Sequence, residues 1–304
     1  MSLAFLPGAL EQGLLWGPMV LGVYLTFRVL DFPDLTVDGC FTLGAATAAR
    51  LILMDQDPLL ATLVAVLVGA LAGLITGFLH TQLKIAPLLA GILTMIGLYS
   101  INLRVMGAAN LSLLRIDTTI TKIENAGLPE QFAAGVLGIA VCLLVLFLLY
   151  IFLQTELGLA IRATGDNEQM IRSLGVNTNT TKMIGLALAN ALCALSGALV
   201  AQYQSYADIG MGIGMIIVGL ASVIIGETLI GNPTLLRALI AAIIGSIIYR
   251  VVIATVLQMG LPSTDLKLLT ALIVTVALAF PVIRSRYSSS LPFLGKGEVR
   301  ARRQ

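Results

Sequence analysis

The sequence has few charged residues, one histidine and three cysteines, and each shortage excludes a class of protein. Charged residues make up 11% of the 304 positions, whereas a soluble domain carries about 25%. Hydrophobic residues make up 58%, which is more apolar surface than so few charges could cover in water. Lipid must therefore be the solvent for most of the chain, and the net charge of +2 gives no basis for nucleic-acid binding.

Residues that serve most enzymes and metal sites are missing or isolated. Cys40, Cys142 and Cys193 lie in apolar stretches without metal-ligand spacing, which favours small core side chains over disulfides or ligands. His80 stands alone beside Lys84 at an expected helix end, where a solvated side chain is a plainer interpretation than a zinc site or a catalytic triad. The sequence lacks HExxH, and it lacks GxSxG near a second catalytic group, which argues against an intramembrane enzyme. We therefore expect a non-catalytic chain without metal or cofactor.

Nine segments are long and apolar enough to cross a bilayer as helices of about 20 residues. They lie near residues 9–30, 36–54, 58–79, 86–103, 131–153, 182–203, 211–231, 234–257 and 266–283. Polar residues or proline interrupt the starts of the second and the fourth, so either could be a broken or re-entrant helix. The fold class that we predict is all-α, a polytopic membrane protein with about 8–10 transmembrane helices.

The distribution of lysine and arginine predicts the orientation. If residues 154–182 face the cytoplasm, about twelve of the 18 basic residues fall on that side, as the positive-inside rule favours. The N-terminus is then outside and the C-terminus inside. Residues 106–130 form the longest external loop, and residues 284–304 form a basic cytoplasmic tail.

An internal repeat appears when the chain is shifted by about 175 residues. Glycines and prolines then coincide as Gly22 with Gly197, Gly39 with Gly214, Gly44 with Gly219, Pro58 with Pro233 and Pro87 with Pro262. The paired helices are five crossings apart, so they run in opposite directions, and an inverted 5+4 repeat of this kind is typical of transporters. We expect one domain over 1–304, with repeat 1 at about 9–103, an unpaired helix at 131–153, a loop at 154–181 and repeat 2 at about 182–283.

The polar loop at 154–181 contains a short helix candidate between Gly165 and Gly175. Asp166 is the expected N-cap, and Asn167 and Glu168 complement the positive end of the helix. Gly175 is the expected C-terminal stop, because glycine accepts the left-handed conformation.

Apolar residues on this short helix recur at helical spacing. Met170, Ile171 and Leu174 form a small apolar face bordered by charges. Such a face suits a groove on a soluble partner, and it equally suits a loop lying on the membrane surface. The residues alone leave both interpretations open.

Three stretches resemble one family of membrane permeases. The run Gly-Leu-Ala-Ile-Arg-Ala-Thr-Gly-Asp-Asn at 158–167, with Leu-Gly-Val-Asn at 174–177, resembles the coupling-helix loop of ABC importer permeases of the branched-chain amino acid and ribose type. The run Asp-Leu-Thr-Val-Asp-Gly at 34–39 resembles an Asp-Leu-Ser-Val-Gly element of the sugar branch, with Asp38 intruding before the glycine. Residues 98–102 and Met106-Gly107 resemble the branch linked to tryptophan and tyrosine uptake.

The resemblance implies a division of labour in the inner membrane of a bacterium. Two permease copies, a homodimer or a pair of close paralogues, would form the pathway, and an extracytoplasmic binding protein would deliver the substrate. A separate ABC ATPase would bind the coupling loop, since this chain has no GxxxxGK[ST] phosphate loop and cannot hydrolyse ATP itself. The ATPase-coupling residues would be Gly165, Asp166, Asn167, Glu168, Met170, Ile171, Leu174 and Gly175.

Polar residues inside or beside the spans are candidates for the substrate path, because such groups are costly in lipid. They are Asp34, Thr36, Asp38, Thr94, Tyr99 and Asn102. Interfacial carboxylates and hydrogen bonds between helices are the commoner uses of such groups and are the favoured explanation. Glu227 and Arg250 could line the path, but structural pairs or extension to the interface are favoured for both.

The substrate stays open at this point. An amino-acid-like solute, aromatic in particular, is slightly favoured over branched-chain amino acids, sugars and nucleosides. The main alternative mechanism is a secondary transporter driven by an ion gradient, for which Asp38 is the one fair relay candidate.

Overall fold

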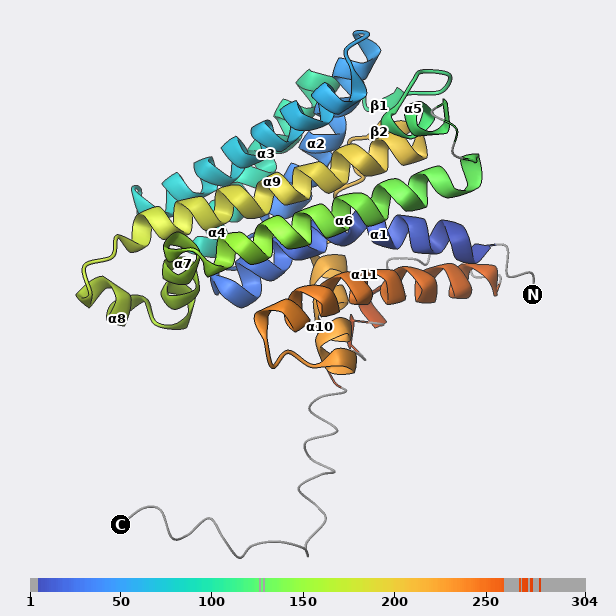
Figure 1. Ribbon diagram of the computed structural model, residues 1–304. Coiled ribbons are helices and arrows are strands. Elements are labelled where there is room, and N and C mark those ends of the chain that lie inside the picture. Colours follow the sequence, from blue (N-terminus) through green and yellow to red (C-terminus); the bar gives the residue numbers. More distant parts are fainter. Residues whose placement is uncertain are drawn as a thin grey trace, which may run out of the picture.

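The protein is represented by a computed structural model, which describes residues 5–125, 127, 129–259, 268, 270–272, 274, 275 and 279 (Figure 1). The helices are α1 (Leu6–Tyr24), the π-helical η2 (Leu25–Val29), α2 (Thr36–Leu53), α3 (Pro58–Thr81), α4 (Pro87–Met106), α5 (Thr119–Asn125), α6 (Glu130–Gln154), α7 (Glu156–Asp166), α8 (Glu168–Ser173), α9 (Thr178–Gln204), α10 (Met215–Ile230) and α11 (Leu235–Gln258). The strands β1 (Asn110–Ser112) and β2 (Tyr206–Asp208) form one antiparallel ribbon, with Leu111 opposite Ala207. The predicted all-α class is confirmed, and the ribbon is an addition that the sequence did not predict.

Six helices in the described part are long and apolar enough to cross a membrane. They are α2, α3, α4, α6, α9 and α11. Helix starts follow local rules: Pro58 and Pro87 occupy first turns, where the missing amide hydrogen costs nothing, and the Asp57 side chain caps α3. The ninth predicted span, 266–283, lies largely outside the described residues.

Helix α9 runs the length of the bundle and packs against α1, α2 and α3 (Figure 1). Small residues allow the close approach: a side chain at Gly44 of α2 would collide with the backbone carbonyl of Ala194 on α9. Both α2 and α9 are 72% buried over their most apolar windows, whereas α4 is 28% buried. The centre of the fold is therefore the α2–α9 contact.

The outward surfaces of α3, α4 and α6 carry large exposed apolar side chains, as contact with lipid requires. Examples are Leu63, Leu67, Leu71, Leu89, Leu93, Leu143, Leu144 and Phe147.

The two ends of the bundle carry different elements. The ribbon and α5 lie at one end of the bundle, together with the start of α1, and α7 and α8 lie at the opposite end (Figure 1). The assignment of the α7–α8 end to the cytoplasm stays a prediction.

The interrupted span is α10, and not α2 or α4 as the sequence had suggested. Helices α2 and α4 are continuous over 18 and 20 residues, whereas the span predicted at 211–231 begins only at Met215 and has 16 helical residues. Gly214 precedes it with φ 87°, a left-handed conformation that glycine adopts without strain. The inverted repeat and the division of the domain stay predictions.

Candidate functional site

The start of α10 is held inside the bundle by a carboxylate of α2. Asp38 accepts hydrogen bonds from the amides of Gly214 and Ile216, each 2.9 Å long, one on each carboxylate oxygen. The hydroxyl of Thr42 accepts a further bond of 3.1 Å from the Gly212 amide. The carboxylate thus satisfies amides that lack a partner within their own helix and lies at the positive end of the helix dipole.

A second carboxylate performs the same task at the start of α2. Asp34 is fully buried and accepts bonds from the Thr36 amide at 2.9 Å and from the Asn190 side chain of α9 at 2.7 Å. A buried carboxyl group of this kind is tolerated only where hydrogen-bond partners compensate the loss of water. Asp34 therefore connects α2 to α9 at the centre of the fold.

Three buried hydroxyls continue this network across the bundle. Thr36 contacts Thr76 of α3 at 2.8 Å, Thr76 donates to Thr94 of α4 at 3.0 Å, and Thr94 donates to the Ala90 carbonyl at 3.0 Å. Thr76 was not among the sequence candidates, because a threonine in an apolar helix gives no sign of its partners. The chain of hydroxyls links three helices.

The remaining path candidates separate into two groups. Asn102 is buried and donates to the Gly39 carbonyl on α2 at 3.0 Å. Tyr99 is 52% exposed on the outward face of α4 and does not join the network. The structure thus brings Asp34, Thr36 and Thr94 together, attaches Asp38 and Asn102 to neighbouring backbone, and leaves Tyr99 on the surface.

The α7–α8 loop consists of two helices and not one. Asn167 has extended backbone angles and accepts a 3.0 Å bond from the Met170 amide, which makes it the N-cap of α8. The prediction that Asp166 is this cap is wrong, because Asp166 is the last residue of α7. The expected stop at Gly175 is consistent with its φ of 86°.

Helix α7 of this loop is packed onto the bundle at two points. A side chain at Gly165 would collide with the carbonyl of Val29, so only glycine permits α7 to lie this close to η2. The hydroxyls of Thr164 and Thr181 meet at 2.9 Å and join α7 to α9.

The apolar face of α8 is smaller than the sequence suggested. Met170 and Leu174 are 51% and 69% exposed, and Leu157 and Leu159 of α7 are also exposed. Ile171 is only 7% exposed, so its expected place on the outer face is wrong. It turns inward because a short helix resting on the bundle needs an apolar contact of its own.

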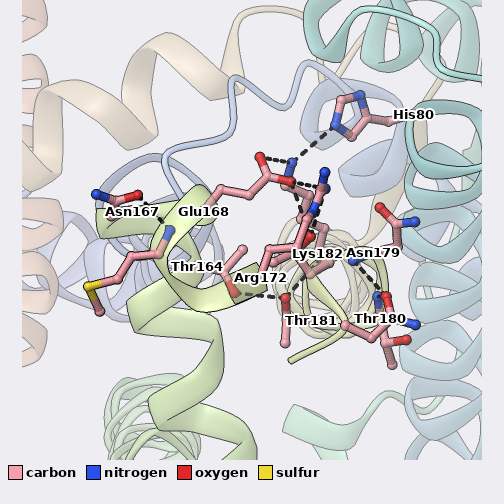
Figure 2. A network of polar contacts seen from close by, with 12 residues as sticks. His80, Thr164, Asn167, Glu168, Arg172, Asn179, Thr180, Thr181 and Lys182 are labelled. Atoms are coloured by element: carbon pink, nitrogen blue, oxygen red, sulfur yellow. Dashed lines mark hydrogen bonds and ion pairs between the residues drawn. The ribbon is translucent and has the colours of Figure 1, made fainter. Parts of the chain in front are cut away.

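Glu168 faces the bundle and not the outside (Figure 2). Its carboxylate binds Arg172 at 2.8 Å, Lys182 of α9 at 2.7 Å and the Thr178 hydroxyl at 3.1 Å. The hydrogen bond from Lys182 is the main reason that the pKa of Glu168 lies below its usual value. His80, expected to be solvated, is partly buried and lies 3.5 Å from the Lys182 ammonium.

Two charges that the sequence left unexplained have partners. Glu227 of α10 pairs with Arg28 of η2. Arg250 of α11 donates to the Gln12 side chain and lies over the Trp16 ring, 4.5 Å from its centroid. Both therefore serve contacts between helices.

A multi-pass helical bundle with helix ends and polar residues buried in its centre is the architecture of a membrane permease. The chain belongs to the family described as branched-chain amino acid transport system / permease component, whose sequence profile matches residues 7–279. It is 43% identical over 270 residues to a tyrosine transport system permease protein of Clostridioides difficile, with 89% of each chain covered.

Other relatives are more distant. An uncharacterized protein of Rickettsia prowazekii is 35% identical over 277 residues, which cover 89% of this chain and 95% of that protein. An autoinducer 2 import system permease protein of Escherichia coli is 26% identical over 160 residues, which cover 52% of this chain and 46% of that protein. No solved structure matches. The chain is thus a permease component of a transport system.

Proposed function

We propose that this chain is the translocation subunit of an ATP-driven ABC importer in a bacterial inner membrane. The observation that carries the proposal is the α7–α8 loop, where Met170 and Leu174 stay exposed on a helix that is fixed to the bundle. A loop that only connected two spans would not need a cap, a glycine contact and an ion pair to hold two apolar side chains outward. A groove on a cytoplasmic ATPase accounts for this arrangement.

The buried carboxylates favour this mechanism over transport driven by an ion gradient. An ion relay needs a carboxylate that is free to release and accept its ion. Both oxygens of Asp38 are occupied by amides of α10, and both oxygens of Asp34 have donors. The two carboxylates are therefore better suited to holding helices together than to relaying ions. We assign a role in positioning the helices around the path to Asp34, Thr36, Asp38, Thr94 and Asn102.

The exposed face of α4 supports a second permease copy. This face carries Tyr99, Ser100 and Arg104, and a side chain added at Gly97 would meet open space. Polar residues on the outside of a span are costly in lipid. A second copy against α4 would cover them and leave Tyr99 in a pathway between the two subunits.

The opposite end of the bundle offers a docking surface for a binding protein. A cleft of about 560 Å³ there is lined by the charged residues Asp55, Asp57, Arg115, Asp117 and Lys122. Asp57 and Lys122 form an exposed ion pair of 2.6 Å, which lowers the pKa of the Asp57 carboxyl. Charges of both signs at such a surface provide specificity and fast association.

The substrate that we propose is an amino acid with an aromatic side chain. The similarity to a tyrosine transport system permease protein is the reason for preferring it over sugars and nucleosides. The binding protein would set most of the specificity.

The test is to isolate the complex from the native host through a tag on this chain and to reconstitute it in liposomes. We expect an ATPase and a binding protein to accompany the chain, and tyrosine uptake to require ATP inside. Uptake that is driven by an ion gradient and persists without ATP would overturn the proposal.

A further inference from the structure

We propose that Lys182 and His80 form a mechanical link that carries the movement of α8 to the start of α4, with His80 as a positioning residue for transport. The inference rests on the proposed function, because it assumes that an ATPase moves α8. It concerns a different step, namely how that movement reaches the helix that carries Tyr99.

The first contact of the link is the ion pair between Glu168 and Lys182. The Lys182 side chain is 14% exposed, so the 2.7 Å pair is partly withdrawn from water and is screened less than a surface pair. Helix α8 has only six residues and few contacts with the rest of the bundle. The polar connections between α8 and α9 in the described residues are made by Glu168, to Lys182 and Thr178, and by Arg172, to Thr178 at 3.0 Å.

The second contact is between Lys182 and His80 (Figure 2). The Nδ1 atom of His80 lies 2.8 Å from the Ile85 carbonyl, an acceptor, so Nδ1 carries the hydrogen. With the hydrogen on Nδ1, Nε2 is the atom that faces the Lys182 ammonium and accepts a long hydrogen bond of 3.5 Å from it. The Phe32 ring packs against the imidazole at 71° and 5.2 Å between centroids, which fixes the plane of the ring.

The third contact places the link at the beginning of α4. Ile85 lies in the turn between α3 and α4, two residues before Pro87 in the first turn of α4. Lys84 in this turn has a positive φ of 58°, a conformation that holds only where the surroundings enforce it. The bond from His80 to the Ile85 carbonyl supplies such a constraint, so the ring connects Lys182 of α9 to the start of α4.

The position of α4 makes this connection consequential. It is the least buried of the six membrane-capable helices in the described part of the chain, so few other contacts restrain it. A shift of Lys182 when α8 moves would act on α4 through His80, at the end of α4 nearest the α7–α8 loop.

The experiment measures the movements of α8 and α4 separately in the purified complex. Spin labels are placed at exposed positions outside the proposed ATPase contact, by Gln169→Cys on α8 or Leu88→Cys on α4, each paired with Leu144→Cys on α6. The three natural cysteines are buried, so labelling at the new sites is selective. Distances are recorded with and without ATP plus vanadate, in otherwise unchanged chains and with Lys182→Met or His80→Asn.

His80→Asn is chosen because asparagine can still donate to the Ile85 carbonyl but cannot reach Lys182. We expect both label pairs to shift with ATP in the unchanged chain. In Lys182→Met and His80→Asn the α8 pair still shifts and the α4 pair does not, and uptake per ATP hydrolysed falls by about tenfold. Lys84→Met is the matched control, because it also removes one positive charge. The Lys84 side chain has no hydrogen bond or ion pair within the described residues. This variant should leave both shifts unchanged.

The two ways of failing are distinct. If α8 does not move with ATP even in the unchanged chain, the proposed function fails. If α8 moves and α4 follows equally in Lys182→Met and His80→Asn, the proposed function stands and the link is overturned.

Discussion

In the α2–α9 centre, carboxylates and hydroxyls are enclosed and bonded to helix ends, whereas at the α7–α8 end polar groups join a short helix to the bundle beside exposed apolar residues. Asp38 holds the start of α10 with both oxygens, and Asp34 holds the start of α2 with one oxygen and accepts from Asn190 of α9 with the other. Glu168 instead shares its charge among Arg172, Lys182 and Thr178, where the short helix meets the bundle. The centre thus encloses its polar groups, and the α7–α8 end leaves apolar side chains exposed, as the proposed contact with an ATPase requires.

The largest contrast is expected between two glycine substitutions. In Gly44→Ala the new methyl group collides with backbone of α9, and we expect a loss of about 1–3 kcal/mol in stability. In Gly97→Ala the methyl group meets open space, and a helix gains about 0.5–1 kcal/mol from alanine over glycine. Thermal unfolding in detergent measures both. Equal behaviour of the two variants would break the distinction between a packed centre and an open α4 face.

The next effect concerns the start of α10. Asp38→Asn replaces one carboxylate oxygen by an amide group that cannot accept a bond from the α10 backbone. We expect a loss of about 1–2 kcal/mol, the range for a helix cap, and faster hydrogen exchange at residues 214–216. The matched control is Asp208→Asn, which affects a turn at the ribbon end. Unchanged exchange in Asp38→Asn would mean that α10 does not depend on this cap.

The smallest effect is a dependence on pH at the α7–α8 end. The pKa of Glu168 is lowered, chiefly by its bond from Lys182, so this group stabilises the fold above its usual value of 4.5 and loses that contribution as the pH falls through the lowered value. Because the carboxylate is partly exposed and screened, we expect no more than about 1 kcal/mol. Glu168→Gln should flatten this part of the stability curve relative to the unchanged chain. A curve of the same shape in both would contradict the role of the ion pair.

The sequence was informative where structure depends on local pattern. Long apolar segments identified the positions of the described spans, and the 154–181 loop was located from its polarity. The glycine at 175 was placed correctly because a left-handed residue commonly ends a helix.

Features that depend on distant partners were not accessible in this way. The late start of α10 follows from Asp38, which lies 176 residues before Gly214 in the chain. Thr76 and Lys182 acquire their roles from neighbours on other helices, and Ile171 turns inward because of how α8 rests on the bundle. The N-cap of α8 is Asn167, one residue after the predicted Asp166, and composition alone does not locate a helix start to within one residue.

Binding of an ATPase to the exposed apolar residues of the α7–α8 loop is tested by isolating tagged Met170→Ser/Leu174→Ser from the native host. Leu67→Ser/Leu71→Ser on the outward face of α3 is the control. We expect the Met170→Ser/Leu174→Ser variant to keep its thermal stability and to lose the co-purifying ATPase, while the α3 control retains it. If this variant brings down as much ATPase as the unchanged chain, the proposed docking of an ATPase on the loop is wrong.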